Sequence, residues 1–447
     1  MSGPAGALAR LREHLARPTD ATGLAAFRVL LGLVLLTQTI RFWANGWIES
    51  LWLGPEFHFT WAGLDWIRPL PGPWMYALMA LQGLAALGLL LGYRTRASAA
   101  LFCLAFTYGE LIDKALYLNH YYLVSLLTLL CVFLPVGATL SLDARRRGPR
   151  LVPQGAYTLL RLQVACVYVF AGLAKLGHDW LQLGEPLRTW LQAHHDLPLV
   201  GPLLDTPGAA LAMSWAGLLH DLAIVPAVLW ARTRAIAFAA AAFFHLAIWL
   251  LFPVGVFSFI MLAALTVCLP PTWPRRLLSR LRLASADQTA PVPASPTSTS
   301  RLTIALGAAW IALQIALPLR HALYPGDVLW TEQGFRFAWR VMLIEKTGHV
   351  DFTITTRSPP GRFVGLTRPD LTPLQSKMMS TQPDMIHDYA HHLAARYRAL
   401  GYEGVSVFAD AWVSLNGRPA ARLVDPTADL ASFPRGPLPQ PWILAPP

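Results

Sequence analysis

Long apolar stretches separated by short polar or basic segments dominate the first three quarters of the chain. A helix needs roughly 20 apolar residues to cross a bilayer, because the hydrocarbon core satisfies no free backbone amide or carbonyl. Nine stretches qualify, at residues 24–45, 73–93, 97–117, 119–142, 154–176, 208–231, 234–252, 255–271 and 302–320. The pattern predicts an α-helical polytopic membrane protein with about nine transmembrane helices.

The pattern changes after about residue 322. The runs HVDFTITT and SVFADAWVSL alternate in the manner of strands, and a helical stretch near 382–399 lies between them. We therefore expect a small C-terminal α+β domain. The predicted parts are an amphipathic N-terminal segment, an eight-span membrane domain, a Pro/Ser/Thr-rich linker, a ninth transmembrane helix and the α+β domain, at residues 1–22, 23–271, 272–301, 302–320 and 321–447.

The composition supports burial in a membrane. Of the 447 residues, 55% are hydrophobic and only 14% are charged, and the mean hydropathy is +0.43, which excludes an ordinary soluble protein. The net charge of +11 could suggest nucleic acid, but the basic residues fall in short clusters between apolar runs rather than on one face. We therefore predict the lipid bilayer as a partner and no nucleic acid.

The basic residues predict the orientation. If the spans alternate from a cytoplasmic N-terminus, sixteen arginines fall on that side, against four basic residues in or beside the opposite loops: Arg68, Lys114, Lys175 and Arg188. This asymmetry follows the positive-inside rule. We expect a multi-pass protein of a bacterial cytoplasmic (inner) membrane, with its C-terminal domain extracytoplasmic. The four cysteines all lie in apolar runs, so no disulfide framework is predicted.

Lys175 is the most informative single position. It lies in YVFAGLAKLGHDW, at the outer end of the fifth predicted span. An ammonium group beside lipid is costly, so such a lysine snorkels to the interface, pairs with an acid, or acts as a base. The residues alone leave these alternatives open.

Three other polar positions come from different spans but fall at the same outer depth. Asn119-His120 begins the fourth span, where an amide and an imidazole can stabilise an oxyanion or pass a proton. His245 lies in the seventh span and His321 closes the ninth. Helix capping, packing and interfacial contacts are the plainer readings. Convergence at one depth nevertheless suggests a pocket.

Other polar residues in the apolar runs have less to suggest a reaction. Asp221, beside His220, lies deeper in the sixth span, where we expect a structural role and a partner such as Arg161 or another buried cation. The run His194-His195-Asp196 is too short a signal for a metal site. No metal-binding, phosphate-loop or nucleophile-elbow motif is present, so no metal is predicted.

Several stretches, in order, resemble vitamin K-dependent γ-glutamyl carboxylase and the wider HTTM family, in a shortened prokaryotic-type form. They are NHYYLVSLL, AGLAKLGHDW, HDLAIVPAVLWARTRAI, FFHLAIWLLFPVGVFSFIMLA, WTEQGFRFAWRVM, DMIHDYAHHLA, FADAWVSLNGR and DPTADL. The last three lie in the predicted α+β domain, where hydrophobicity alone cannot produce a match.

The resemblance implies a carboxylase that is also a quinol epoxidase. Lys175 would deprotonate vitamin K hydroquinone (phylloquinol or menaquinol), whose reaction with O2 yields the epoxide and a base that removes a γ-proton from glutamate before CO2 adds. By the same resemblance Asn119, His120 and His245 join Lys175 as catalytic residues, and the predicted cofactor-binding residues are His321, Phe257, Phe259 and Trp180. The implied partners are a glutamyl peptide or protein and a reductase that supplies the hydroquinone.

The chain also departs from the family. It ends soon after DPTADL, the position before Lys175 is Ala174 rather than a second lysine, and no cysteine pair matches the disulfide of the animal enzymes. Two alternatives therefore stay open: a quinol epoxidase without peptide carboxylation, and a non-enzymatic quinone or lipid transporter or scaffold. A different acyl or small-molecule chemistry on the same scaffold is a third.

Overall fold

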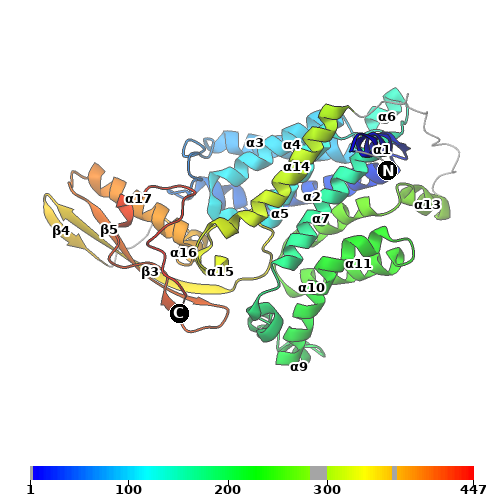
Figure 1. Cartoon of the computed structure of the whole chain (residues 1–447). Coiled ribbons are helices and arrows are strands. Elements are labelled where there is room, and N and C mark those ends of the chain that lie inside the picture. Colours follow the sequence, from blue (N-terminus) through cyan, green and yellow to red (C-terminus); the bar gives the residue numbers. More distant parts are fainter. Residues whose placement is uncertain (1–3, 282–299, 365–369, 447) are drawn as a thin grey trace.

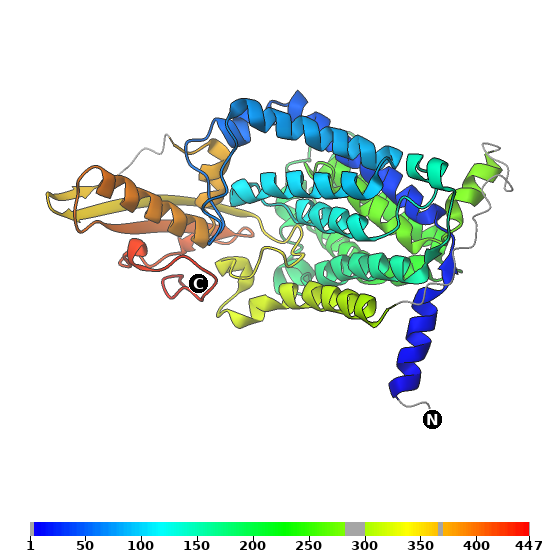
Figure 2. The same cartoon turned by 90° about the horizontal axis from the view of Figure 1, so that it is seen from above.

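A bundle of long helices carries the C-terminal domain at one end (Figure 1). The computed structural model describes residues 4–281, 300–364 and 370–446. Most of the predicted linker, residues 282–299, lies outside the described residues. Seen from above, the bundle helices run side by side, and α1 (Pro4–Ala16) projects from the end opposite the C-terminal domain (Figure 2).

The bundle forms because each long helix buries apolar residues against its neighbours. Its main helices are α2 (Thr22–Ala44), α3 (Gly72–Leu91), α4 (Thr95–Ile112), α5 (Asn119–Phe133), α7 (Gln154–Leu173), α10 (Pro207–Leu229), α11 (Arg234–Leu251), α12 (Phe257–Leu265) and α14 (Arg301–Leu319). Leu24, Phe27 and Leu31, at helical spacing on α2, are fully buried in the largest core cluster. Helix α2 packs against α3, α12 and α13 (Trp273–Arg280).

Six helices of the described residues are long and apolar enough to cross a membrane: α2, α3, α7, α10, α11 and the helix Arg301–Leu323, which joins α14 to η6 (Arg320–Leu323). A seventh candidate bends by 100° where α12 and η4 (Thr266–Cys268) meet α13. The protein is therefore mostly helical and apolar, and the count of nine spans stays a prediction.

Prolines shorten two of the predicted spans. Helix α5 ends at Phe133, well before residue 142, because Leu134 precedes Pro135 and adopts extended backbone. Pro270 and Pro271 separate η4 from α13 and break the stretch predicted over 255–271.

A buried arginine closes the end of α3 that lies away from the C-terminal domain. Arg28 on α2 donates to the carbonyls of Leu89 and Leu90 over 2.7 Å each and to that of Leu140 over 2.6 Å. These bonds satisfy carbonyls that the helix end leaves free. Gly92 follows α3 at φ +66°, and a Cβ there would lie 2.7 Å from the Arg28 guanidinium. The turn therefore requires glycine.

Short elements connect the bundle helices. The helical ones are η1 (Glu49–Leu53), η2 (Lys114–Leu116), α6 (Leu142–Arg147), η3 (Asp179–Leu183), α8 (Leu187–Gln192), α9 (Gly201–Leu204) and α15 (Val328–Thr331). A two-residue antiparallel pair joins β1 (Pro18–Thr19) to β2 (Val152–Pro153). Through side chains of η2 and η3 the bundle contacts the C-terminal domain.

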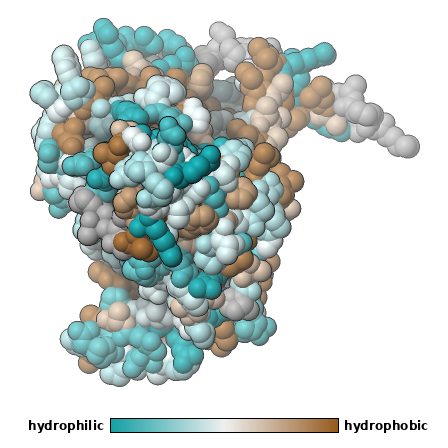
Figure 3. All heavy atoms as spheres, turned by 90° about the vertical axis from the view of Figure 1, so that its left-hand side faces the viewer, coloured by the Kyte–Doolittle hydropathy of each residue, from teal (hydrophilic) through white to brown (hydrophobic). Residues whose placement is uncertain are grey.

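The C-terminal domain is an antiparallel sheet with α17 (Pro383–Ala399) packed on it. The strand order is β4-β3-β5-β6, with bounds Pro360–Phe363, Lys346–Arg357, Ser406–Leu415 and Ala421–Arg422. Alternate residues of β3 and β5 enter a separate core. The two predicted strands and the helix near 382–399 are confirmed. Helices α16 (Pro373–Met379) and η7 (Leu430–Ser432) complete the domain, and polar residues cover much of its outer face (Figure 3).

An ion-pair network fastens this domain to the bundle. Lys114 of η2 is buried, and its Nζ lies 2.8 Å from Asp384 and 2.5 Å from Asp388, both on α17. Arg336 binds Asp384 over 2.6 Å, and Arg435 binds Asp388 over 2.6 Å. Each carboxylate of the network therefore has two cationic partners.

Candidate functional site

A small cavity lies where four bundle helices meet the C-terminal domain. Its lining comes from α7, α10, α11 and α12, from the segments around η3 and α8, and from the chain just before β3: Val167, Tyr168, Ala171, Lys175, Trp180, Leu187, Met213, Gly217, Asp221, Phe244, His245, Ile248, Phe252, Phe257, Met261, Val341 and Met342. Its volume is about 70 Å³. We call Val341 and Met342 the roof, because they come from the segment just before β3 and cover the cavity from the side of the C-terminal domain.

Lys175 forms a buried ion pair at this cavity. Lys175 and Asp221 are 6% and 7% exposed, and the lysine Nζ lies 2.8 Å from Asp221 Oδ2. Nζ also donates to the carbonyl of Ala171 over 3.2 Å. Lys175 follows the last residue of α7 by two positions, so its side chain folds back along that helix toward α10. A snorkelling lysine would point to water; this one is paired and buried.

Two aromatic hydrogen-bonding groups lie on the same wall. The Tyr168 hydroxyl lies 2.8 Å from His245 Nε2. The other ring nitrogen of His245, Nδ1, is buried without a hydrogen-bond partner in the structure. His220 lies beside them, with its ring centroid 5.7 Å from that of His245. The cavity therefore contains a tyrosine–histidine hydrogen bond next to the lysine–aspartate ion pair.

Aromatic rings form the rest of the wall and separate His120 from His245. The Trp180 ring centroid lies 5.1 Å from Lys175 Nζ, a cation–π distance. Phe257 lies between the two histidines, at 5.9 Å from the ring of His245 and 5.8 Å from that of His120. His120 is thus one ring away from the cavity.

The structure brings together four of the predicted site residues and sets the other four apart. Lys175, His245, Phe257 and Trp180 line one cavity, and His120 adjoins it. The remaining three have different surroundings.

Asn119 donates from Nδ2 to the carbonyl of Arg340, over 3.1 Å, and so tethers α5 to the segment before β3. His321 lines a neighbouring cavity of about 400 Å³. Phe259 packs against Trp249, with ring centroids 5.5 Å apart.

The expected partner of Asp221 was wrong in one respect. Arg161 does not reach it; its guanidinium donates instead to the carbonyls of Val267 and Leu269. The alternative, another buried cation, is the one that applies, and it is Lys175. Two lone opposite charges in otherwise apolar helices were the signal that could have predicted this pair.

Tyr168 and the roof were also missed. A tyrosine in an apolar run is ordinary, and the segment before β3 carries no hydrophobic pattern that points to the bundle. The roof ends the stretch WTEQGFRFAWRVM, so the family resemblance was the one signal that could have pointed to it.

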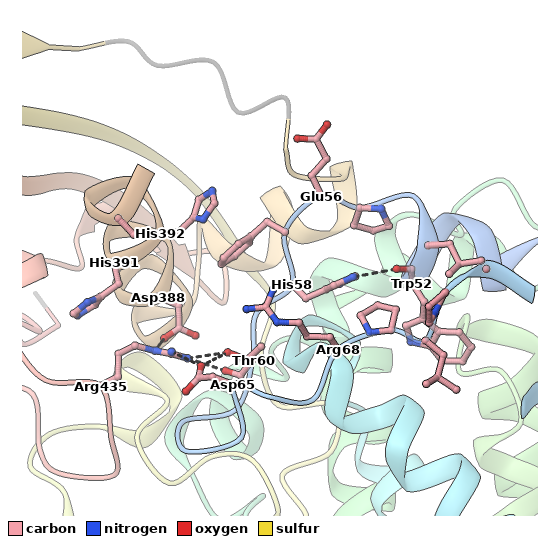
Figure 4. A pocket seen from close by; sticks show the side chains of 18 residues that line it. Trp52, Glu56, His58, Thr60, Asp65, Arg68, Asp388, His391, His392 and Arg435 are labelled. Atoms are coloured by element: carbon pink, nitrogen blue, oxygen red, sulfur yellow. Dashed lines mark hydrogen bonds and ion pairs between the residues drawn. The ribbon is translucent and has the colours of Figure 1, made fainter. Parts of the chain in front are cut away.

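A larger cavity lies elsewhere, between the outer segment before α3 and α17 (Figure 4). It has a volume of about 740 Å³ and contains none of the predicted site residues. Figure 4 shows Arg435 directed at Asp65, Thr60 and Asp388, so this cation is already held within the protein. In the described ranges no group of three or more His, Cys, Asp or Glu side chains is arranged to hold a metal ion.

Comparisons with known families match both parts of the chain. The family model described as the HTTM domain matches residues 16–273. The model described as the vitamin K-dependent gamma-carboxylase, lumenal domain matches residues 299–447. No solved structure matches the chain. The two matched ranges meet in space at the cavity that holds Lys175.

Proposed function

Because this chain belongs to the HTTM family and carries a vitamin K-dependent gamma-carboxylase lumenal domain, we propose that it is a membrane-embedded, hydroquinone-dependent γ-glutamyl carboxylase with Lys175 as its base. The observation that carries the proposal is the buried Lys175–Asp221 pair, which faces an apolar cavity closed by the lumenal-type domain. The membrane would be the bacterial cytoplasmic membrane, with the C-terminal domain outside.

The residues present fit the head group of a vitamin K hydroquinone. Such a ligand is flat and largely apolar, with one hydroxyl at each end. Trp180, Phe244 and Phe257 supply aromatic faces, and the ion pair and His245 supply polar contacts. His245 Nδ1 is a buried polar atom that still lacks a partner. When bound, the hydroquinone would supply the reaction with O2 that creates a base stronger than any side chain.

The cavity must widen before it holds a ring system, because about 70 Å³ accommodates only a few water molecules. Three methionines in the wall, Met213, Met261 and Met342, provide that adaptability. Their unbranched side chains change rotamer at low cost. We therefore expect the apolar walls, rather than the ion pair, to move on binding.

The ion pair would act as a single proton acceptor. Written as ammonium with carboxylate or as amine with carboxylic acid, the Lys175–Asp221 pair holds one shared proton across the 2.8 Å contact. In either form it accepts one further proton and ends as ammonium with carboxylic acid. The 2.8 Å contact would let this proton pass directly between Nζ and Oδ2.

The neighbouring groups would orient the hydroquinone and exclude water. The Tyr168–His245 hydrogen bond fixes the imidazole, and His120 lies beyond Phe257 on the same side. The roof and the aromatic wall keep bulk water from the base, which would otherwise be quenched. The glutamyl substrate would arrive from the extracytoplasmic side, CO2 would be the second co-substrate, and a separate reductase would supply the hydroquinone.

The test measures the two products separately. Purified protein in lipid nanodiscs is incubated with menaquinol or phylloquinol, O2, bicarbonate and a glutamyl peptide, and quinone epoxide and γ-carboxyglutamate are quantified by mass spectrometry. Lys175→Met is compared with Lys377→Met, because Lys377 is exposed on the C-terminal domain.

We expect both products from the native protein and from Lys377→Met, and neither from Lys175→Met. Epoxide without carboxylated peptide would replace the proposal by a quinol epoxidase. Neither product from folded native protein would favour the transporter or scaffold alternative.

A further inference from the structure

The carboxylate of Asp179 joins the end of α7 to the C-terminal domain. It lies in η3, shortly after Lys175, and is 8% exposed. Arg418, in the turn after β5, donates from Nη1 to Oδ2 over 2.8 Å and from Nη2 to Oδ1. Asn416, in the same turn, donates to Oδ2 over 2.8 Å. Burial alone would raise the pKa of Asp179, but the bonds from Arg418 and Asn416 outweigh it, and the pKa lies below its usual value.

The same turn holds the chain next to the roof. Asn416 Nδ2 also donates to the carbonyl of Leu343 over 3.2 Å, and its Oδ1 accepts from the amide of Glu345 over 2.9 Å. Leu343 directly follows Met342, which lines the Lys175 cavity. One asparagine side chain therefore ties the roof segment to Asp179.

Trp180, the residue after Asp179, separates two cavities. Its indole is 4% exposed and donates to the carbonyl of Ser214 on α10 over 2.6 Å. It lines the Lys175 cavity and also the neighbouring cavity of about 400 Å³, which contains Asp179 and Arg418. The position of this indole decides whether the two cavities are separate.

We propose that Asp179, Arg418 and Asn416 form a latch through which the C-terminal domain sets the position of Trp180 and of the roof. None of the three lines the Lys175 cavity, so they are positioning residues. With the latch closed, Trp180 and the roof cover the Lys175 cavity on the side of the C-terminal domain. With it open, the two cavities join and a glutamyl side chain can approach. This inference rests on the proposed function for its substrate, and on the contacts alone for its geometry.

The latch also neutralises the carboxylate of Asp179, which follows Lys175 by four positions. Asp179 is an ionised carboxylate in the same short segment as the lysine. Because Arg418 neutralises it with two hydrogen bonds, Asp221 stays the carboxylate that pairs with Lys175. Loss of Arg418 would leave Asp179 with Asn416 and His178 as its partners, and without the guanidinium that neutralises it.

The first measurement needs no activity. Hydrogen exchange is followed in nanodiscs for the amides of residues 179–183 and 341–345. Arg418→Gln is compared with Arg422→Gln, which breaks an exposed ion pair with Asp410 on the same hairpin. We expect exchange in both segments to accelerate at least about tenfold in Arg418→Gln and less than about twofold in Arg422→Gln, because local opening sets the rate. Equal rates in the two variants would overturn the latch.

The second measurement asks what the latch does for the reaction. In Arg418→Gln the ratio of epoxide to γ-carboxyglutamate should rise at least about fivefold, since water reaches and quenches the base. Arg418→Lys, which keeps one charged bond, should give an intermediate ratio and serves if the glutamine variant does not fold. An unchanged ratio in both variants contradicts the proposal. Absence of both products from native protein would refute the proposed function and leave the exchange result standing.

Discussion

Lys175 and Lys114 are both 6% exposed, yet their ammonium groups have different surroundings. Lys114 lies between two carboxylates, Asp384 and Asp388, which are bound in turn by Arg336 and Arg435. Lys175 has one carboxylate and one carbonyl, and the rest of its surroundings is an apolar cavity. Both lysines line cavities, of about 530 Å³ for Lys114 and about 70 Å³ for Lys175. The first joins two parts of the protein through several ion pairs, and the second forms one ion pair within the bundle.

The difference separates a network that joins two domains from the ion pair that we propose to be catalytic. In the Lys114 network each carboxylate has two cationic partners. In the Lys175 pair one ammonium group meets one carboxylate. Burial alone therefore does not separate the two lysines; the number of their charged partners does.

The largest expected effect is the contrast between Lys175→Met and Lys114→Met. Epoxide formation should fall at least about 10³-fold in Lys175→Met, in line with loss of a positioned base, and the variant should also lose stability, because Asp221 is left buried without its cation. Lys114→Met should destabilise the folded protein by about 3 kcal/mol or more, because it leaves Asp388 buried and short of a partner. Activity per folded molecule should stay within a few fold. Calorimetry and product assays on the same samples test both, and the reverse pattern would reject the comparison.

Replacing the acid partner of each lysine should give a smaller difference in epoxide formation. We expect Asp221→Asn to lower epoxide formation by about 10- to 100-fold, since the amide cannot share the proton of Lys175. Asp388→Asn should have a much smaller effect on the reaction, because Lys114 keeps its 2.8 Å contact with Asp384. Initial rates at saturating hydroquinone measure the difference, and equal losses would mean that Asp221 is only a structural partner.

A pH titration of stability tests helix α17, which carries the two carboxylates that bind Lys114. His387, on α17, is 3% exposed, and burial, with a smaller contribution from His391, lowers its pKa from 6.5 to about 4. The unfolded chain therefore binds a proton below pH 6.5 that the folded chain takes up only near pH 4. The contribution of His387 to the free energy of unfolding should be fully present above pH 6.5 and fall by up to about 1.4 kcal/mol per pH unit between pH 6.5 and about 4. His387→Gln should flatten this slope in thermal melts; an unaltered slope would assign it to other groups.

The smallest effect concerns two phenylalanines of α12. Phe257 lines the cavity between two histidines, so Phe257→Ala should raise the KM for hydroquinone by about three- to tenfold through lost ring contacts. Phe259 packs against Trp249 outside the cavity, and Phe259→Ala should change the KM less. Steady-state kinetics with both variants decides, and a larger effect at Phe259 would place the quinone elsewhere.

The sequence predicted those elements whose pattern is local. The alternation in HVDFTITT and SVFADAWVSL marks β3 and β5, because one face of each strand is buried. Lys175 stood out because a charge in an apolar run is costly. Both conclusions need only neighbouring residues.

What the sequence could not supply are contacts between distant segments. Asp221 pairs with Lys175 rather than Arg161 because helix packing, not spacing in the chain, brings α10 against the end of α7. The roof comes from a segment about 170 residues beyond Lys175 with no pattern of its own. The fourth and eighth predicted spans are longer than the observed helices for a simpler reason. Hydropathy takes no account of backbone geometry, and the prolines at 135, 270 and 271 end these helices.

The roof over Lys175 has a consequence for engineering. Val341 and Met342 belong to the range that matches the lumenal domain, whereas Lys175 belongs to the range that matches the HTTM domain. Neither half contains the whole cavity. A hybrid that joins this bundle to the C-terminal half of a relative must therefore have compatible side chains where the two ranges meet. A bundle expressed by itself would expose Lys175 to solvent.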